Sequence, residues 1–110
     1  MDKAMAYSVL VTWADNSNNP QRAEWCYKQM LNLLLADERE TINFFRVQKD
    51  STYLDLLSRL LPELAYQFNS RIFLRKMEEI GRVHNSQVWQ KNLAIAKTKV
   101  KAPEIDEMDF

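Results

Sequence analysis

The sequence holds one cysteine and one histidine, two residue types often used for nucleophilic and metal chemistry. They are Cys26 and His84, and no cysteine or carboxylate accompanies His84 at the spacing of a zinc site. A thiolate–imidazole pair would require the fold to bring the two together, and no motif around either residue supports it. We interpret Cys26 as a buried structural side chain. Neither residue is expected to have a catalytic or metal role.

Neighbouring carboxylates offer a second route to chemistry, as paired general acids and bases. They form two groups, Glu78-Glu79 and the set Asp37, Glu38 and Glu40. Adjacent acids on a helix are typical of a solvated face or a helix cap, and Asp37 and Glu40 have the spacing of a capping box. The single glycine, Gly81, argues against a glycine-rich phosphate loop. The sequence therefore favours a protein that is not an enzyme and that has no cofactor.

Composition favours one soluble helical domain. The 110 residues are 46% hydrophobic, which supplies a modest core. One glycine and three prolines are too few for the turns of an all-β fold. We expect no membrane span, because no window of about 18 residues is apolar throughout, and no signal peptide at the polar start. A single cysteine fits the reducing cytoplasm.

The helices that hold these residues are expected to pack around a central helix over 62–80. Pro62 suits the first helical position, and Gly81 suits a left-handed cap just past Ile80. The apolar stripe rotates near Asn69 and Ser70, so either one helix is buried on two sides or two helices meet there. We favour one helix, because Asn-Ser is a weak breaker. The expected fold is all-α, a compact bundle of five or six helices, with a domain over 1–101 and a flexible acidic tail over 102–110.

Further helices are expected over 4–14, 20–36, 37–47, 50–61 and 86–101. The expected cap residues are Asn19, Asp37, Asp50 or Ser51, and Ser86. Segment 4–14 also alternates like a strand, but no second strand candidate exists to pair with it. The most buried side chains should be those of Met30, Leu34, Leu64, Phe68 and Ile72.

Trp25 points away from the apolar face of the helix expected over 20–36. Two interpretations are open. The indole packs against the N-terminal segment, or it is an exposed anchor for a protein partner, because tryptophan is enriched at binding hot spots.

The charges are unevenly distributed, although the net charge is zero. Four acids and no base lie within 104–109, whereas the rest of the chain carries 15 bases and 11 acids, a net charge of +4. Segment 74–101 loosely resembles a helix-turn-helix, with Gly81 in the turn. The turn is one residue longer than in that motif, and Arg82 replaces an apolar residue. The resemblance implies a recognition helix over 86–101; the alternative is a solvated helix.

The residues that this resemblance assigns to nucleic acid fall into two groups. Base contacts would come from side chains at the start of the helix, and phosphate contacts from lysines near its end. The candidate nucleic-acid residues are Arg82, Gln87, Gln90, Lys91, Lys97, Lys99 and Lys101.

The last seven residues interleave acids with apolar side chains. The segment resembles the acidic, Phe-ended tips of single-stranded-DNA-binding proteins. It is also similar to the C-terminal peptides by which some phage polymerases and transcription factors hold a sliding clamp, and it would suit a PDZ-type groove. The resemblance implies that an aromatic anchor enters an apolar pocket while acids meet a basic rim. The alternative is a purely solubilising end. The candidate partner-binding residues are Ile105, Met108, Asp109 and Phe110, together with Trp25.

These observations favour a non-enzymatic protein-interaction module, a monomer or weak dimer in the cytoplasm. It would be a small accessory or regulatory factor, of cellular or viral origin. Its body would dock one protein, and its tail would tether to a component of a replication or transcription machine such as a sliding clamp. The alternative is a nucleic-acid-binding protein that uses segment 74–101, with the acidic tail competing in cis for the basic helix.

Overall fold

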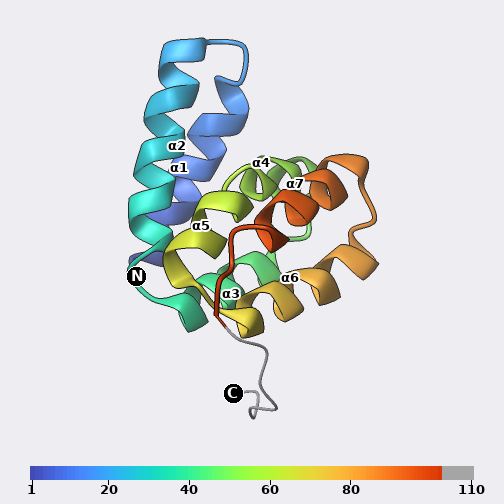
Figure 1. Cartoon of the computed structure of the whole chain (residues 1–110). Coiled ribbons are helices and arrows are strands. Elements are labelled where there is room, and N and C mark those ends of the chain that lie inside the picture. The colour runs from blue at the N-terminus through green and yellow to red at the C-terminus, as the bar shows by residue number, and fades with distance from the viewer. Residues whose placement is uncertain (103–110) are drawn as a thin grey trace.

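The computed structural model describes residues 1–102, and in this range the chain is entirely α-helical and compact (Figure 1). The all-α prediction is confirmed. The described range holds seven helices, where five or six were expected. They are α1 (Lys3–Asp15), α2 (Pro20–Leu34), α3 (Glu38–Val47), α4 (Ser51–Ser58), α5 (Leu61–Phe68), α6 (Arg71–Val83) and α7 (Gln87–Lys97). None of these helices has the length and apolar character needed to cross a membrane.

Side-chain caps begin most of the helices at the residues that the sequence indicates. Each capping oxygen accepts a hydrogen bond from a backbone N–H of the first turn, a donor that has no partner inside the helix. The expected caps are Asn19 for α2, Asp37 for α3, Asp50 for α4 and Ser86 for α7. The expected capping box at α3 is half formed: Asp37 Oδ1 accepts from Glu40 N at 2.9 Å, and Glu40 Oε2 lies 2.6 Å from the amino nitrogen of Met1.

The expected central helix is wrong, because the chain breaks it into α5 and α6. Asn69 ends α5 in the left-handed region, with φ of 48°. Ser70 then begins α6, and its Oγ accepts from Phe73 N at 3.1 Å and donates to Glu38 Oε2 at 2.6 Å. Asparagine tolerates the left-handed region better than other non-glycine residues, so Asn-Ser acts here as a helix stop followed by a helix start. This break accounts for the seventh helix.

Gly81 does not form the expected left-handed cap. It lies inside α6, which continues to Val83, and its φ is not positive. Its role is close packing: a Cβ at this position would lie 2.6 Å from Trp89 Nε1 and 2.8 Å from Trp89 Cδ1. The glycine therefore allows the buried indole of α7 to rest directly on the backbone of α6.

The core joins all seven helices, with Trp13, Phe45, Phe73 and Trp89 as its largest side chains. The burial expected for Met30, Leu34 and Leu64 is confirmed, since each is fully buried. The burial expected for Phe68 and Ile72 is wrong, because both are only partly buried. Phe68 ends α5 at the break and packs edge-on against Phe73, with ring centroids 5.4 Å apart.

Two units are visible in the arrangement (Figure 1). Helices α1 and α2 pack against each other as an antiparallel pair whose connecting turn lies at one end of the molecule. The other helices gather beside the opposite end of this pair, and α7 packs against α4, α5 and α6.

The last described residues return to the break between α5 and α6. Helix α7 ends at Lys97, four residues before the expected end at 101. Asn69 Oδ1 then accepts from the backbone N of Lys101 at 2.7 Å and from that of Ala102 at 3.0 Å, and Arg71 Nε donates to Ala102 O at 3.0 Å. The expected tail begins at this point, and the flexibility predicted for it lies outside the described residues.

Candidate interaction surfaces

His84 belongs to a polar cluster that ties the turn between α6 and α7 to α4. Asp55 Oδ1 lies 2.7 Å from His84 Nε2 and accepts from Ser86 Oγ at 2.6 Å. The same serine hydroxyl accepts from Trp89 N at 3.0 Å as the cap of α7. In a catalytic triad the imidazole contacts the serine hydroxyl, whereas here both groups contact one carboxylate oxygen. The arrangement is suited to holding the turn in place.

Cys26 is fully buried in α2. Burial raises the pKa of its thiol above the ordinary value of 9.0, and the charge of Arg22 opposes this only in part. The thiol is therefore protonated at neutral pH, which disfavours reaction as a nucleophile. Within residues 1–102, no group of three or more His, Cys, Asp or Glu side chains is placed to hold a metal ion.

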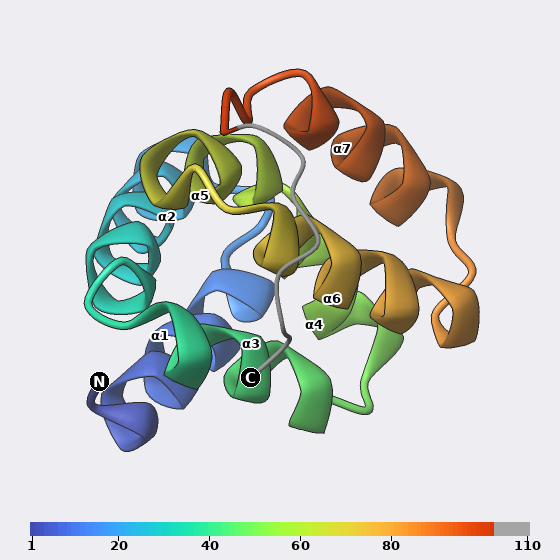
Figure 2. The ribbon, with the colours of Figure 1, turned by 60° about the horizontal axis from the view of Figure 1, so that its bottom comes forward.

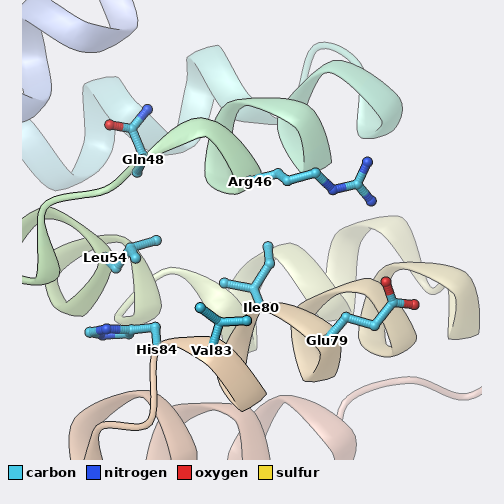
Figure 3. A pocket seen from close by; sticks show the side chains of 7 residues that line it. All are labelled: Arg46, Gln48, Leu54, Glu79, Ile80, Val83 and His84. Carbon is cyan, nitrogen blue, oxygen red and sulfur yellow. The ribbon is translucent and has the colours of Figure 1, made fainter.

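A hollow of about 210 Å³ lies between α3, α4 and α6. Figure 3 shows Ile80 and Val83 near its middle, and Leu54 between Gln48 and His84. Arg46 and Glu79 stand at one end, and Gln48 and His84 at the other (Figure 3). The hollow thus has an apolar floor and a polar rim, and protein–protein interfaces commonly have an apolar centre and a polar rim.

A second hollow, of about 310 Å³, lies between α1 and α3 and shares Gln48 with the first. Its lining includes Tyr7, Phe44 and Val47. We call the surface that joins the two hollows the α3 edge, and define it by Tyr7, Val47, Gln48, Ile80 and Val83. Val83 is 90% exposed and Val47 is 65% exposed, so two β-branched apolar side chains stand in water at this edge.

Sequence reasoning missed the α3 edge. The signal that could have found it is Val83, which lies three residues beyond Ile80 and shares its helix face only if α6 continues through Gly81. Reading Gly81 as a cap placed Val83 in a turn and hid this face. Val47 gives no such signal, because the hollow beside it forms only where the fold brings α1 next to α3.

Trp25 is 50% exposed on α2, so the expectation that it points away from the apolar face is confirmed. The aromatic partner of α1 on this helix is instead Tyr27, whose ring lies edge-on to Trp13 with centroids 6.1 Å apart. Trp25 lies on a different helix from every residue of the α3 edge. The other candidate partner residues, Ile105, Met108, Asp109 and Phe110, lie outside the described residues.

Some of the candidate nucleic-acid residues are simply exposed, and others bond to a neighbouring helix. Arg82, Gln87, Lys91 and Lys99 are exposed. Gln90 Nε2 donates to Gly81 O at 3.2 Å, so this amide joins α7 to α6. Lys97 Nζ lies 3.5 Å from Glu78 Oε1.

Helices α3 and α6 lie side by side on the face turned forward in Figure 2. Basic side chains line two hollows beside α6. A hollow of about 170 Å³ between these helices is lined by Arg39, Ile42, Asn43, Arg46 and Lys76. Another, of about 240 Å³ between α6 and α7, is lined by Arg71, Leu74, Arg75, Glu78 and Lys97. We call the surface that contains these two hollows the basic α6 face.

No protein family, curated protein or solved structure matches the chain.

Proposed function

We propose that the chain is a non-enzymatic protein-interaction module, a small accessory or regulatory factor. Its helical body docks one protein through the α3 edge. Its segment 104–110 tethers to a second protein, a component of a replication or transcription machine such as a sliding clamp. The observation that carries the proposal is the exposure of Val83 and Val47, 90% and 65%, beside two hollows with apolar floors.

Exposed apolar side chains beside a hollow are the usual anchors of a protein interface. Burying one valine side chain contributes about 1.5–3 kcal/mol by transfer from water. The loss of both contacts would therefore weaken binding by roughly two or more orders of magnitude, at about 1.4 kcal/mol for each factor of ten. The polar rim of Arg46, Gln48 and Glu79 would set the orientation of the partner.

The test is a pull-down experiment. Each variant is immobilised and exposed to a lysate of the organism that encodes the chain, and the retained proteins are compared between variants. The double variant V47E/V83E should lose one set of proteins. The matched control is V88E, because Val88 is also exposed, at 43%, but lies on α7. Circular dichroism should show equal melting temperatures for the variants.

The tethering segment is tested in the same experiment by Phe110→Ala. This variant should lose a different set of proteins, because an aromatic anchor is removed while the α3 edge is intact. Retention of the same proteins by the wild type, V47E/V83E and F110A would refute the proposal. Self-association that V47E/V83E abolishes would identify a second copy of this chain as the partner of the edge.

Nucleic-acid binding is a second candidate function, favoured by the basic side chains of Arg71, Arg75 and Lys97 around the hollow between α6 and α7. The measurement is the affinity for a generic DNA duplex as a function of salt. For a phosphate-binding surface, the logarithm of the affinity falls linearly with the logarithm of the salt concentration, and the slope increases with the number of counterions released. A steep salt dependence that the double variant R75Q/K97Q reduces would support this function.

A further inference from the structure

The end of the described chain lies beside the basic α6 face. The carbonyl oxygen of Ala102 accepts from Arg71 Nε at 3.0 Å, and Arg71 lines the hollow between α6 and α7. Asn69 holds the backbone of Lys101 and Ala102 at the same corner. The described chain therefore ends next to this face.

The charges of the basic α6 face and of segment 104–109 are complementary. The lining of the two hollows includes one acidic side chain, Glu78, and six basic side chains, those of Arg39, Arg46, Arg71, Arg75, Lys76 and Lys97. Lys97 pairs with Glu78 at 3.5 Å and Lys76 with Glu79 at 3.8 Å, so the basic charge exceeds the acidic charge beside it. Segment 104–109 carries four acids and no base. Attraction between unit charges near a protein surface reaches about 4 kcal/mol at 4 Å before desolvation and screening are subtracted.

The hollows also offer apolar floors, at Ile42 and at Leu74, which are 3% and 5% exposed. The segment alternates its acids with Ile105, Met108 and Phe110. The chemistry of the face and that of the segment therefore match in both charge and apolar content.

The connection is long enough for docking within one molecule. The eight residues 103–110 span up to about 27 Å, at roughly 3.3–3.6 Å per residue. Packed helices such as α3 and α6 lie about 8–10 Å apart. Both hollows are thus within reach of the segment, and a short connection gives an effective concentration of about 1 mM.

We propose that residues 104–110 dock in cis on the basic α6 face. The acids contact the cations of α3 and α6, and apolar side chains of the segment cover the floors of the hollows. Docking conceals the segment from the protein to which it would tether. A partner with a basic surface of its own competes with the α6 face, so tethering requires displacement of the segment. The docking itself occurs in the isolated protein, and its test is independent of any partner.

The first experiment is an NMR comparison of the full chain with its neutral-tail variant, E104Q/D106N/E107Q/D109N. The amide resonances of residues 39–46 and 71–76 should shift, whereas those of α1 and α2 should not. Adding 0.5 M NaCl to the wild type should shift the same resonances in the same direction, because salt screens the attraction.

The second experiment adds a synthetic peptide of residues 104–110 to the full-length wild type and to the neutral-tail variant. The peptide should bind the wild type about tenfold more weakly than it binds the neutral-tail variant, because the native segment competes for the same face. This factor holds if the peptide binds the open face with a Kd of about 0.1 mM and the native segment is present at about 1 mM. The peptide should bind R39Q/R46Q in the neutral-tail background at least tenfold more weakly than that background alone. The control is R22Q/K28Q, which removes the same charge from exposed residues of α2 and should leave peptide affinity unchanged.

Three results would overturn the proposal. The first is that the shifts on neutralisation are confined to residues 103–110. The second is that R22Q/K28Q weakens peptide binding as much as R39Q/R46Q. The third is that the differences in chemical shift between the wild type and the neutral-tail variant disappear when both proteins are diluted. That result would mean that the segment docks on a second copy of the chain.

Discussion

Replacing Gly81 by alanine should destabilise the protein, although the opposite would be expected at an ordinary helical position. Alanine is favoured over glycine inside a helix by about 1 kcal/mol, and it also reduces the freedom of the unfolded chain. At this position, however, the new Cβ would lie 2.6 Å from Trp89 Nε1 and 2.8 Å from Trp89 Cδ1. Contacts of this length force a neighbouring group to move.

The indole has little room to move. It is fully buried, its Nε1 donates to Met77 O at 3.2 Å, and its ring lies edge-on to Phe45 and to His84, with centroids 6.2 Å and 5.7 Å away. Overpacking a core costs about 1–3 kcal/mol. Loss of the hydrogen bond to Met77 adds about 1 kcal/mol. After subtraction of the helical gain, G81A should lower the free energy of unfolding by roughly 1–3 kcal/mol.

The assay is urea unfolding of the wild type, G81A, W89L and the double variant G81A/W89L, followed by circular dichroism. W89L removes the two closest atoms that the Cβ would meet and leaves Gln90 Nε2 at 3.1 Å, the end of a flexible side chain, so adding G81A to this background should cost little stability. The coupling free energy between the two sites should then be at least about 1 kcal/mol, a size typical of contacting residues. The reasoning is refuted if G81A raises the unfolding midpoint of the wild type, or if the two substitutions are additive.

Three further predictions concern the core. L64A should cost about 2–5 kcal/mol in urea unfolding, because Leu64 is fully buried, and F68A should cost less, because Phe68 is only partly buried; equal costs would contradict this placement. T41V should cost about 1–3 kcal/mol, because the buried Thr41 hydroxyl donates to Leu34 O and its loss leaves that carbonyl without this donor, whereas T41S should retain most of the stability. The contribution of Cys26 to stability should be constant below pH 9.0 and fall above it, because burial raises the pKa of the folded thiol and only the unfolded thiol ionises there; the wild type should therefore lose more stability than C26A between pH 8.5 and pH 10, and equal losses would show that the thiol does not titrate differently on folding.

Local chemistry made much of the fold predictable. The caps at Asn19 and Asp37 depend on a side chain and on backbone groups within the next turn, so the sequence contains the whole interaction. The break at Asn69 could not be predicted from local sequence. Either helical arrangement satisfies the local sequence, and the choice depends on Glu38 and Lys101, more than 30 residues away, which bond to Ser70 and Asn69.

Gly81 shows the same limit for a single residue. A lone glycine after a helical stretch usually marks a cap, and only the neighbouring helix reveals that the missing side chain leaves room for Trp89. The α3 edge was hidden for a related reason, since Val83 lies on α6 and Val47 on α3, and each stands beside a hollow formed with other helices. Helical periodicity placed Trp25 away from the apolar face of α2, which its exposure of 50% confirms, but it left open whether the indole is packed or exposed.

Asn69 combines two tasks that a substitution can separate. Its backbone makes the left-handed turn, and its side-chain oxygen holds the amides of Lys101 and Ala102. Glycine would keep the turn and release the two amides. In N69G, hydrogen exchange should therefore accelerate at these amides through local opening, while the amides of the core exchange as before. One exposed amide side chain therefore anchors the last two described residues, Lys101 and Ala102, at the break between α5 and α6.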